Sequence, residues 1–142
     1  MSSFTFKLPH LRKYGPLCRV VIKPSEPTIK KLKLEKKNVP SVDVLALIDT
    51  GASSTAVSRR VIKKLKLVPR GMAKVYTSSS KSEMRDEFDI SLESETGAYL
   101  SLLRVLDANL SGQSFDCLIG RDVLQFGVFT YNGRKNQITL TF

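Results

Sequence analysis

The sequence predicts a mostly β fold, closed or barrel-like, with one short amphipathic helix. Three observations lead to this fold class. Short apolar or alternating runs recur along the chain, turn residues such as Glu95-Thr96-Gly97 and Asn132-Gly133 separate them, and only one segment has apolar residues at helical spacing. The chain has 142 residues, enough for one domain with its own core. We expect a single domain over 1–142, with a core over about 16–142 and an N-terminal extension over 1–15.

The first half of the chain contains the predicted helix and the strands before it. Residues 18–22 are predicted to form the first strand, and residues 29–34, which alternate apolar residues with lysine, an exposed hairpin arm at a sheet edge. Residues 42–48 are almost continuously apolar, which predicts a strand buried on both faces. Residues 57–68 carry an apolar stripe at helical spacing, with Ser58 as the N-cap and Pro69 and Gly71 ending the segment.

The second half reads as a series of hairpins. Residues 73–77 and 84–93 form one hairpin with a polar tip, and further strands follow over 99–106 and 115–119. Residues 121–125 have room for a single helical turn. A closing hairpin joins 128–131 to 137–142 through Asn132-Gly133.

Composition narrows the function classes. The net charge of +10 comes largely from basic clusters at 30–37 and 59–66, which we interpret as a solvated face. Because no aromatic residues alternate with these cations, a nucleic-acid partner is not favoured. No apolar run is long enough for a membrane helix and no secretory signal is visible, so we expect a cytoplasmic protein without a membrane partner.

Cysteine and histidine usage bears on metals and redox state. Cys18 and Cys117 are far apart in sequence and read as reduced, buried thiols, although a disulfide stays open. His10 is the single histidine, so a site of His and Cys ligands is poorly supported. We expect neither a metal nor a cofactor.

Two apolar runs end in short polar motifs. Leu45-Ala-Leu-Ile leads into Asp49-Thr50-Gly51-Ala52, and Leu118-Ile119 leads into Gly120-Arg121-Asp122. The first motif alone is also compatible with a surface β-turn. Together, with a hairpin between them, the two motifs resemble the retropepsin-like aspartic proteases, which include the retroviral proteases and their cellular and bacterial relatives. The resemblance covers about residues 19–142 and implies the small closed barrel of that family, with a flap hairpin and a C-terminal interface strand.

The resemblance implies roles for the matching residues. Asp49 is the catalytic acid, Thr50 hydrogen-bonds across a dimer axis, Gly51 admits the substrate backbone and Ala52 completes the loop. Gly120 packs near this loop, Arg121 braces the dimer by ion pairing, and residues 138–142 pair with the partner copy. The residues expected in the flap are Val75, Tyr76, Thr77, Ser78, Ser79, Ser80 and Lys81. The second motif consists of Leu118, Ile119, Gly120, Arg121 and Asp122.

The number of acid motifs predicts the assembly. In an aspartic protease two carboxylates activate a water, one as general base and one as general acid. The chain has a single Asp-Thr-Gly, so a dyad needs a second copy: a homodimeric aspartic endopeptidase acting on polypeptide substrates. The alternative is an inactive dimerisation or protein-binding module with the same fold.

Three departures from the family pattern stand out. Ser53 replaces the acid that usually pairs with the arginine, so either Asp122 or another acid substitutes or the dimer is weaker. The flap tip is rich in serine rather than glycine. The segment 24–38 is longer and more basic than the short retroviral forms need, and the family pattern assigns it no use.

Overall fold

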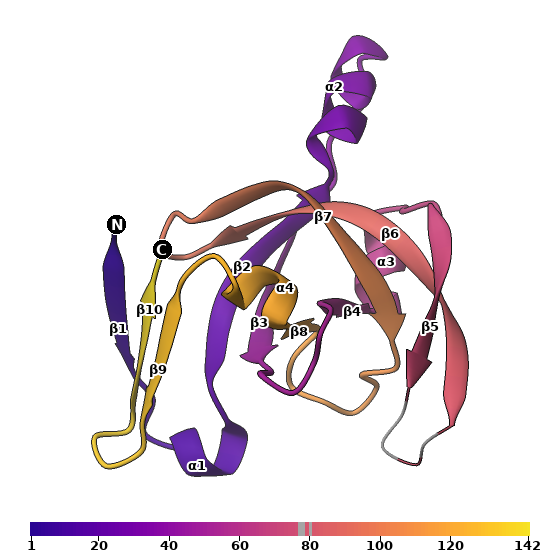
Figure 1. Ribbon diagram of the computed structural model, residues 1–142. Coiled ribbons are helices and arrows are strands. Elements are labelled where there is room, and N and C mark those ends of the chain that lie inside the picture. Colours follow the sequence, from indigo (N-terminus) through magenta and orange to yellow (C-terminus); the bar gives the residue numbers. More distant parts are fainter. Residues whose placement is uncertain (77–78, 80) are drawn as a thin grey trace.

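The computed structural model describes residues 1–76, 79 and 81–142, and these residues form a β-barrel with a separate small sheet beside it (Figure 1). The prediction of a mostly β, barrel-like fold is confirmed. The strands are β1 (Ser3–Lys7), β2 (Leu17–Pro24), β3 (Val42–Ile48), β4 (Ala56–Ser58), β5 (Gly71–Tyr76), β6 (Ser82–Ser94), β7 (Tyr99–Ala108), β8 (Cys117–Ile119), β9 (Val128–Asn132) and β10 (Gln137–Thr141). The helices are α1 (Leu11–Tyr14), α2 (Glu26–Leu34), α3 (Arg59–Lys64) and α4 (Arg121–Leu124). No helix among the described residues has the length and apolar character needed to cross a bilayer.

The barrel closes because β2 pairs with both of its neighbours in the ring. The strand order is β2-β3-β8-β4-β7-β6, β6 pairs back onto β2, and β5 extends the sheet beyond β6. Most neighbours are antiparallel, but β3 and β8 run parallel, with Ile48 opposite Ile119. The carboxyl ends of these two strands therefore meet at one edge of the barrel, which brings the segments after Ile48 and Ile119 together.

The helix predicted over 57–68 is shorter than its apolar stripe. Residues 56–58 form β4, which pairs with β7 and β8, and α3 begins only after it. The predicted N-cap is confirmed, since the side chain of Ser58 accepts a hydrogen bond from the Val61 amide at 3.3 Å. Val61 and Leu65 from the stripe are both buried in the core. The strand was missed because its three residues are too few to distinguish the two-residue period of a strand from the 3.6-residue period of a helix.

The exposed hairpin arm predicted over 29–34 is wrong, because these residues belong to α2. Pro27 lies in the first turn of this helix, where its fixed φ favours helix and its missing N–H costs no hydrogen bond. Ile29 is buried at the base of the helix, while Leu34 is 86% exposed. In Figure 1, α2 stands out from the barrel. The apolar residues of this segment are at 29, 32 and 34, a spacing that fits a short helix as well as a strand. A pattern of only six residues could not decide between the two.

The small sheet has the order β1-β10-β9 and uses both ends of the chain. No element was predicted for the N-terminal extension, yet β1 pairs with β10 over its whole length and Leu11 is 1% exposed. Residues 3–14 are thus part of the fold. Since β10 lies between β1 and β9, both of its edges are already paired within the chain.

The two cysteines are buried and free, as predicted. Cys18 lies opposite Ala46 on β3, and Ala46 lies opposite Cys117 on β8. Two strand spacings separate the cysteines by about 9.5 Å, beyond the reach of a disulfide. Burial raises the pKa of the Cys18 thiol to about 12, so it stays protonated at neutral pH. The same β3 is buried on only one face, with Leu45 and Leu47 half-buried, rather than on both as predicted.

Candidate active site

Asp49 is the first residue after β3 and lies beside the end of β8. Its amide donates to the Ile119 carbonyl at 2.8 Å, extending the parallel ladder by one residue. Asp49 is half-buried, and Oδ1 of its carboxylate accepts a hydrogen bond from the Gly51 amide at 3.0 Å. The Ala52 amide donates to the backbone carbonyl of Asp49 at 3.2 Å. The loop of residues 49–52 is therefore a tight turn folded around the Asp49 side chain, with Thr50 and Gly51 exposed at its tip.

Gly120 packs directly against this loop. A Cβ atom at Gly120 would lie 2.7 Å from the carbonyl carbon of Ser54, 2.8 Å from its oxygen and 3.0 Å from the carbonyl oxygen of Ala52. These are backbone atoms, which cannot move aside as a flexible side chain could. Glycine is required here for close approach of two backbones, not for an unusual φ.

A buried hydrogen-bond chain joins the two motifs through Thr55, which sequence reasoning missed. The Thr55 hydroxyl donates to Asp122 Oδ1 at 2.7 Å and its amide donates to Oδ2 at 2.9 Å. The same hydroxyl accepts from the Gly120 amide at 3.1 Å. Thr55 has no exposed surface. The residue that could have pointed to this link is Asp122, an acid in the first turn of the short helix α4. Its carboxylate also accepts a hydrogen bond from the Val123 amide at 2.9 Å.

Arg121 holds the Asp49 loop from its own chain. Its backbone amide donates to the Ala52 carbonyl, and its Nη1 donates to the Thr50 carbonyl, both at 2.8 Å. The suggestion that Asp122 replaces the missing acid as the partner of Arg121 is wrong, because Thr55 occupies that carboxylate. Leu118 and Ile119 lie in β8, where Ile119 is buried and Leu118 half-buried, so they position the motif by packing.

The hairpin of β5 and β6 lies where the flap was predicted. Figure 1 shows it extending from the barrel on the side where β3 ends. Val75 is half-buried, Tyr76 is 74% exposed, and Ser79 and Lys81 are exposed at the tip. The Lys74 ammonium lies 5.8 Å from the centroid of the Tyr76 ring. The other three predicted flap residues, Thr77, Ser78 and Ser80, lie outside the described residues.

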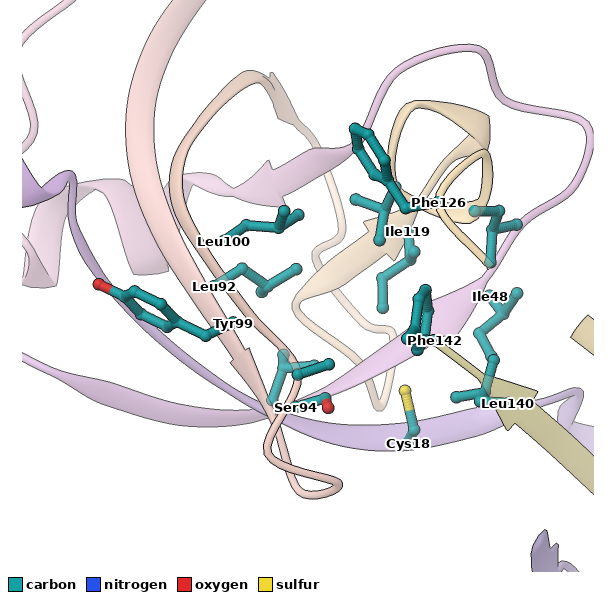
Figure 2. Close-up of a pocket in the computed structure, with 14 residues that line it drawn as sticks. Cys18, Ile48, Leu92, Ser94, Tyr99, Leu100, Ile119, Phe126, Leu140 and Phe142 are labelled. Carbon is teal, nitrogen blue, oxygen red and sulfur yellow. The ribbon is translucent and has the colours of Figure 1, made fainter. Parts of the chain in front are cut away.

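An apolar pocket of about 280 Å³ lies behind the candidate site, between the barrel and the small sheet (Figure 2). Ile48 and Ile119, the residues before Asp49 and Gly120, point into it together with Phe142. Among the described residues that line it, the polar side-chain groups are the Cys18 thiol, the Ser94 hydroxyl and the exposed Tyr99 hydroxyl. None of the described residues that line the pocket is an acid.

Comparisons with known proteins identify the fold and the family of the chain. The chain is similar in structure to EIAV protease solved with an inhibitor, with a TM-score of 0.53 and 18% identity over 84% of this chain and 92% of that one. It is also similar to a retropepsin-like aspartic protease from Rickettsia conorii, with a TM-score of 0.52 and 15% identity over 89% and 93% of the two chains. At these identities the likeness shows the fold. No curated protein sequence matches the chain significantly. The sequence pattern of the aspartyl protease family matches residues 36–123, more than half of the chain, and the chain therefore belongs to the aspartyl protease family.

Proposed function

We propose that this chain is an aspartic endopeptidase that works as a homodimer, with one Asp49 from each copy. The observation that carries the proposal is the position of Asp49. It ends β3 in a tight turn, its carboxylate is held by the Gly51 amide, and Gly120 packs against the same loop. The family of the chain is that of the aspartyl proteases. Since the sequence contains one Asp-Thr-Gly, the second carboxylate has to come from a second copy.

In the proposed reaction one of the two carboxylates acts as the general base and the other as the general acid. The ionised Asp49 removes a proton from a water as that water attacks the peptide carbonyl, and the protonated Asp49 of the other copy donates its proton to the carbonyl oxygen. The C–N bond of this intermediate then breaks as the first Asp49 passes its proton to the leaving nitrogen and the second Asp49 takes a proton back from a hydroxyl of the intermediate. Two carboxylates a few ångström apart share one proton because they cannot both ionise without repulsion. Gly51 holds Asp49 directly, because its amide donates to Asp49 Oδ1, whereas Arg121 acts on Asp49 through the loop, by its bond to the Thr50 carbonyl.

The dimer would have to form without β10 as an edge strand. The family resemblance suggested that residues 138–142 pair with a partner, but both edges of β10 are occupied by β1 and β9. Backbone pairing with a second copy is therefore expected at the outer edge of β1 or β9. Phe126 and Val128, which are 63% and 57% exposed at the start of β9, supply apolar surface for such a contact.

The proposal is tested by cleavage of unfolded casein between about pH 3 and 8, the range in which a carboxylate pair can titrate. Wild type is compared with Asp49→Asn, with and without a statine-type inhibitor, at several protein concentrations. Asp43→Asn is the matched control, since it removes an exposed carboxylate from the same strand. We expect Asp49→Asn and the inhibitor to abolish cleavage, Asp43→Asn to leave it intact, and activity to rise faster than linearly with concentration.

Three outcomes would contradict the proposal. If wild type is as inert as Asp49→Asn at every pH while sedimentation shows a dimer, the chain is a binding or dimerisation module. If cleavage persists in Asp49→Asn, another group carries the activity. A linear dependence on concentration together with a monomeric sedimentation coefficient would reject the shared dyad.

A further inference from the structure

A groove of about 710 Å³ lies between the ends of α2 and α3, far from Asp49. Its lining includes Leu32 and Lys36 at the end of α2, Lys66 and Val68 after α3, and Pro40 just before β3. β3 runs from this groove to Asp49, and its seven residues span about 20 Å. The groove and the candidate active site are thus at opposite ends of one strand.

The groove is strongly cationic. Lys36, Lys37, Lys66 and Arg70 line it, and within the described part of the chain no salt bridge joins Lys36, Lys66 or Arg70 to a carboxylate. Asp89 is the one acid in the lining, and its carboxylate already accepts from Arg104 at 2.9 Å. The positive charge of the groove is therefore available to an anionic partner.

Two of these lysines have an unusual backbone conformation. Lys36 has φ 56° and Lys66 has φ 54°, and each lies just beyond the end of its helix, α2 or α3. Helices that end in this left-handed conformation usually place glycine there, because a Cβ atom makes it unfavourable. Strained residues that converge on one concave surface are a reason to look for a function of their side chains.

Apolar side chains lie among the cations. Leu32 and Leu67 are half-buried in the lining and Val68 is 66% exposed. No aromatic residue lines the groove, so it has no platform for stacked bases. Apolar side chains surrounded by cations suit a chain that carries carboxylates and apolar groups together.

We propose that this groove binds an acidic polypeptide segment. Apolar side chains of the segment lie on Leu32, Leu67 and Val68, while its carboxylates meet Lys36, Lys66 and Arg70. Because the groove is about 20 Å from Asp49, this binding does not depend on peptidase activity. It assigns a use to the basic segment 24–38, which the family pattern leaves without one.

The test uses the full chain and a fluorescent peptide of about 15 residues that alternates Glu pairs with Leu, long enough for one groove-bound helix. The double variant Lys36→Gly/Lys66→Gly removes both side chains at positions where glycine is the favoured residue. We therefore expect its melting temperature to equal or exceed that of wild type, while the peptide binds about tenfold more weakly. Loss of binding cannot then be attributed to loss of fold.

Two controls and one competing ligand, a single-stranded RNA, keep the proposal open to refutation. Arg134→Gln/Lys135→Gln removes two exposed cations from the β9–β10 turn, which Figure 1 places far from α2, and should leave binding unchanged. A peptide with Ser in place of Leu should bind more weakly at equal charge. The proposal is overturned if both double variants weaken binding equally, if the Ser peptide binds as well as the Leu peptide, or if a single-stranded RNA binds more tightly and is lost in Lys36→Gly/Lys66→Gly.

Discussion

Thr55 and Asp122 join the two halves of the candidate site, since one buried threonine donates to both carboxylate oxygens of one aspartate, at 2.7 and 2.9 Å. The Gly120 amide completes the arrangement by donating to the Thr55 hydroxyl. The loop that carries Asp49 and the turn that carries Arg121 are thereby held in a single arrangement before any partner or substrate binds.

Replacing Thr55 by valine should destabilise the protein by about 2 kcal/mol, because the half-buried Asp122 carboxylate loses one of its donors and the Gly120 amide loses its acceptor. Urea unfolding measures the change. Thr55→Ser keeps the hydroxyl and removes only a methyl group, so it should cost about 1 kcal/mol. Equal losses in both variants would mean that packing, not hydrogen bonding, explains the position.

Alanine at Gly120 should destabilise by about 2 kcal/mol and displace the loop, because its Cβ would overlap the Ser54 carbonyl group. Gly71→Ala is a suitable control, since the nearest atom to its Cβ would be 3.7 Å away and the φ of Gly71 is not positive. Thermal unfolding of the two variants side by side gives the comparison. A Gly120→Ala protein as stable as Gly71→Ala would show that the loop can shift at little cost.

Arg121→Met should affect activity more than stability. The side chain is exposed, so the unfolding free energy should change by less than about 0.5 kcal/mol. Without the bond from Nη1 to the Thr50 carbonyl the loop is less well placed, and kcat/KM for casein should fall about tenfold. Arg134→Met, an exposed arginine in the β9–β10 turn, should change neither quantity. A fall in melting temperature that parallels the fall in activity would instead indicate a structural role.

Protonation of Asp116 should cause part of the protein's loss of stability in acid. Its carboxylate accepts from Arg60 Nη2 at 2.7 Å and from the Ser58 hydroxyl at 2.8 Å, and these hydrogen bonds hold the pKa of Asp116 below its ordinary value. Because the folded state has the lower pKa, the stabilisation is complete above the unfolded pKa of about 3.9 and disappears as pH falls through the folded value.

The partial exposure of this pair limits the effect to about 1 kcal/mol. Asp116→Asn should therefore be less stable than wild type at pH 7, and the difference should shrink as the pH is lowered toward 3. Asp43→Asn removes a more exposed ion pair and should show a smaller difference at pH 7. A gap between wild type and Asp116→Asn that stays constant with pH would reject the linkage.

The sequence by itself determined most strands of the barrel, though not β4, together with the N-cap at Ser58 and the two motifs at Asp49 and Gly120. Period-2 alternation, turn residues and capping are local in the chain, so they can be read without knowing what packs against what. The same holds for the count of one Asp-Thr-Gly, from which the homodimer proposal follows.

Other features depended on partners far away in the chain. Residues 29–34 form a helix rather than a hairpin arm because their period is ambiguous over so short a length and Ile29 packs at the base of α2. β1 is a strand because β10 provides an edge more than 100 residues later. Thr55 links the two motifs only because β3 and β8 run parallel, and Lys36 and Lys66 share a groove only because α2 and α3 end beside each other. Contacts of this kind leave no period in the sequence, and tertiary packing alone decides them.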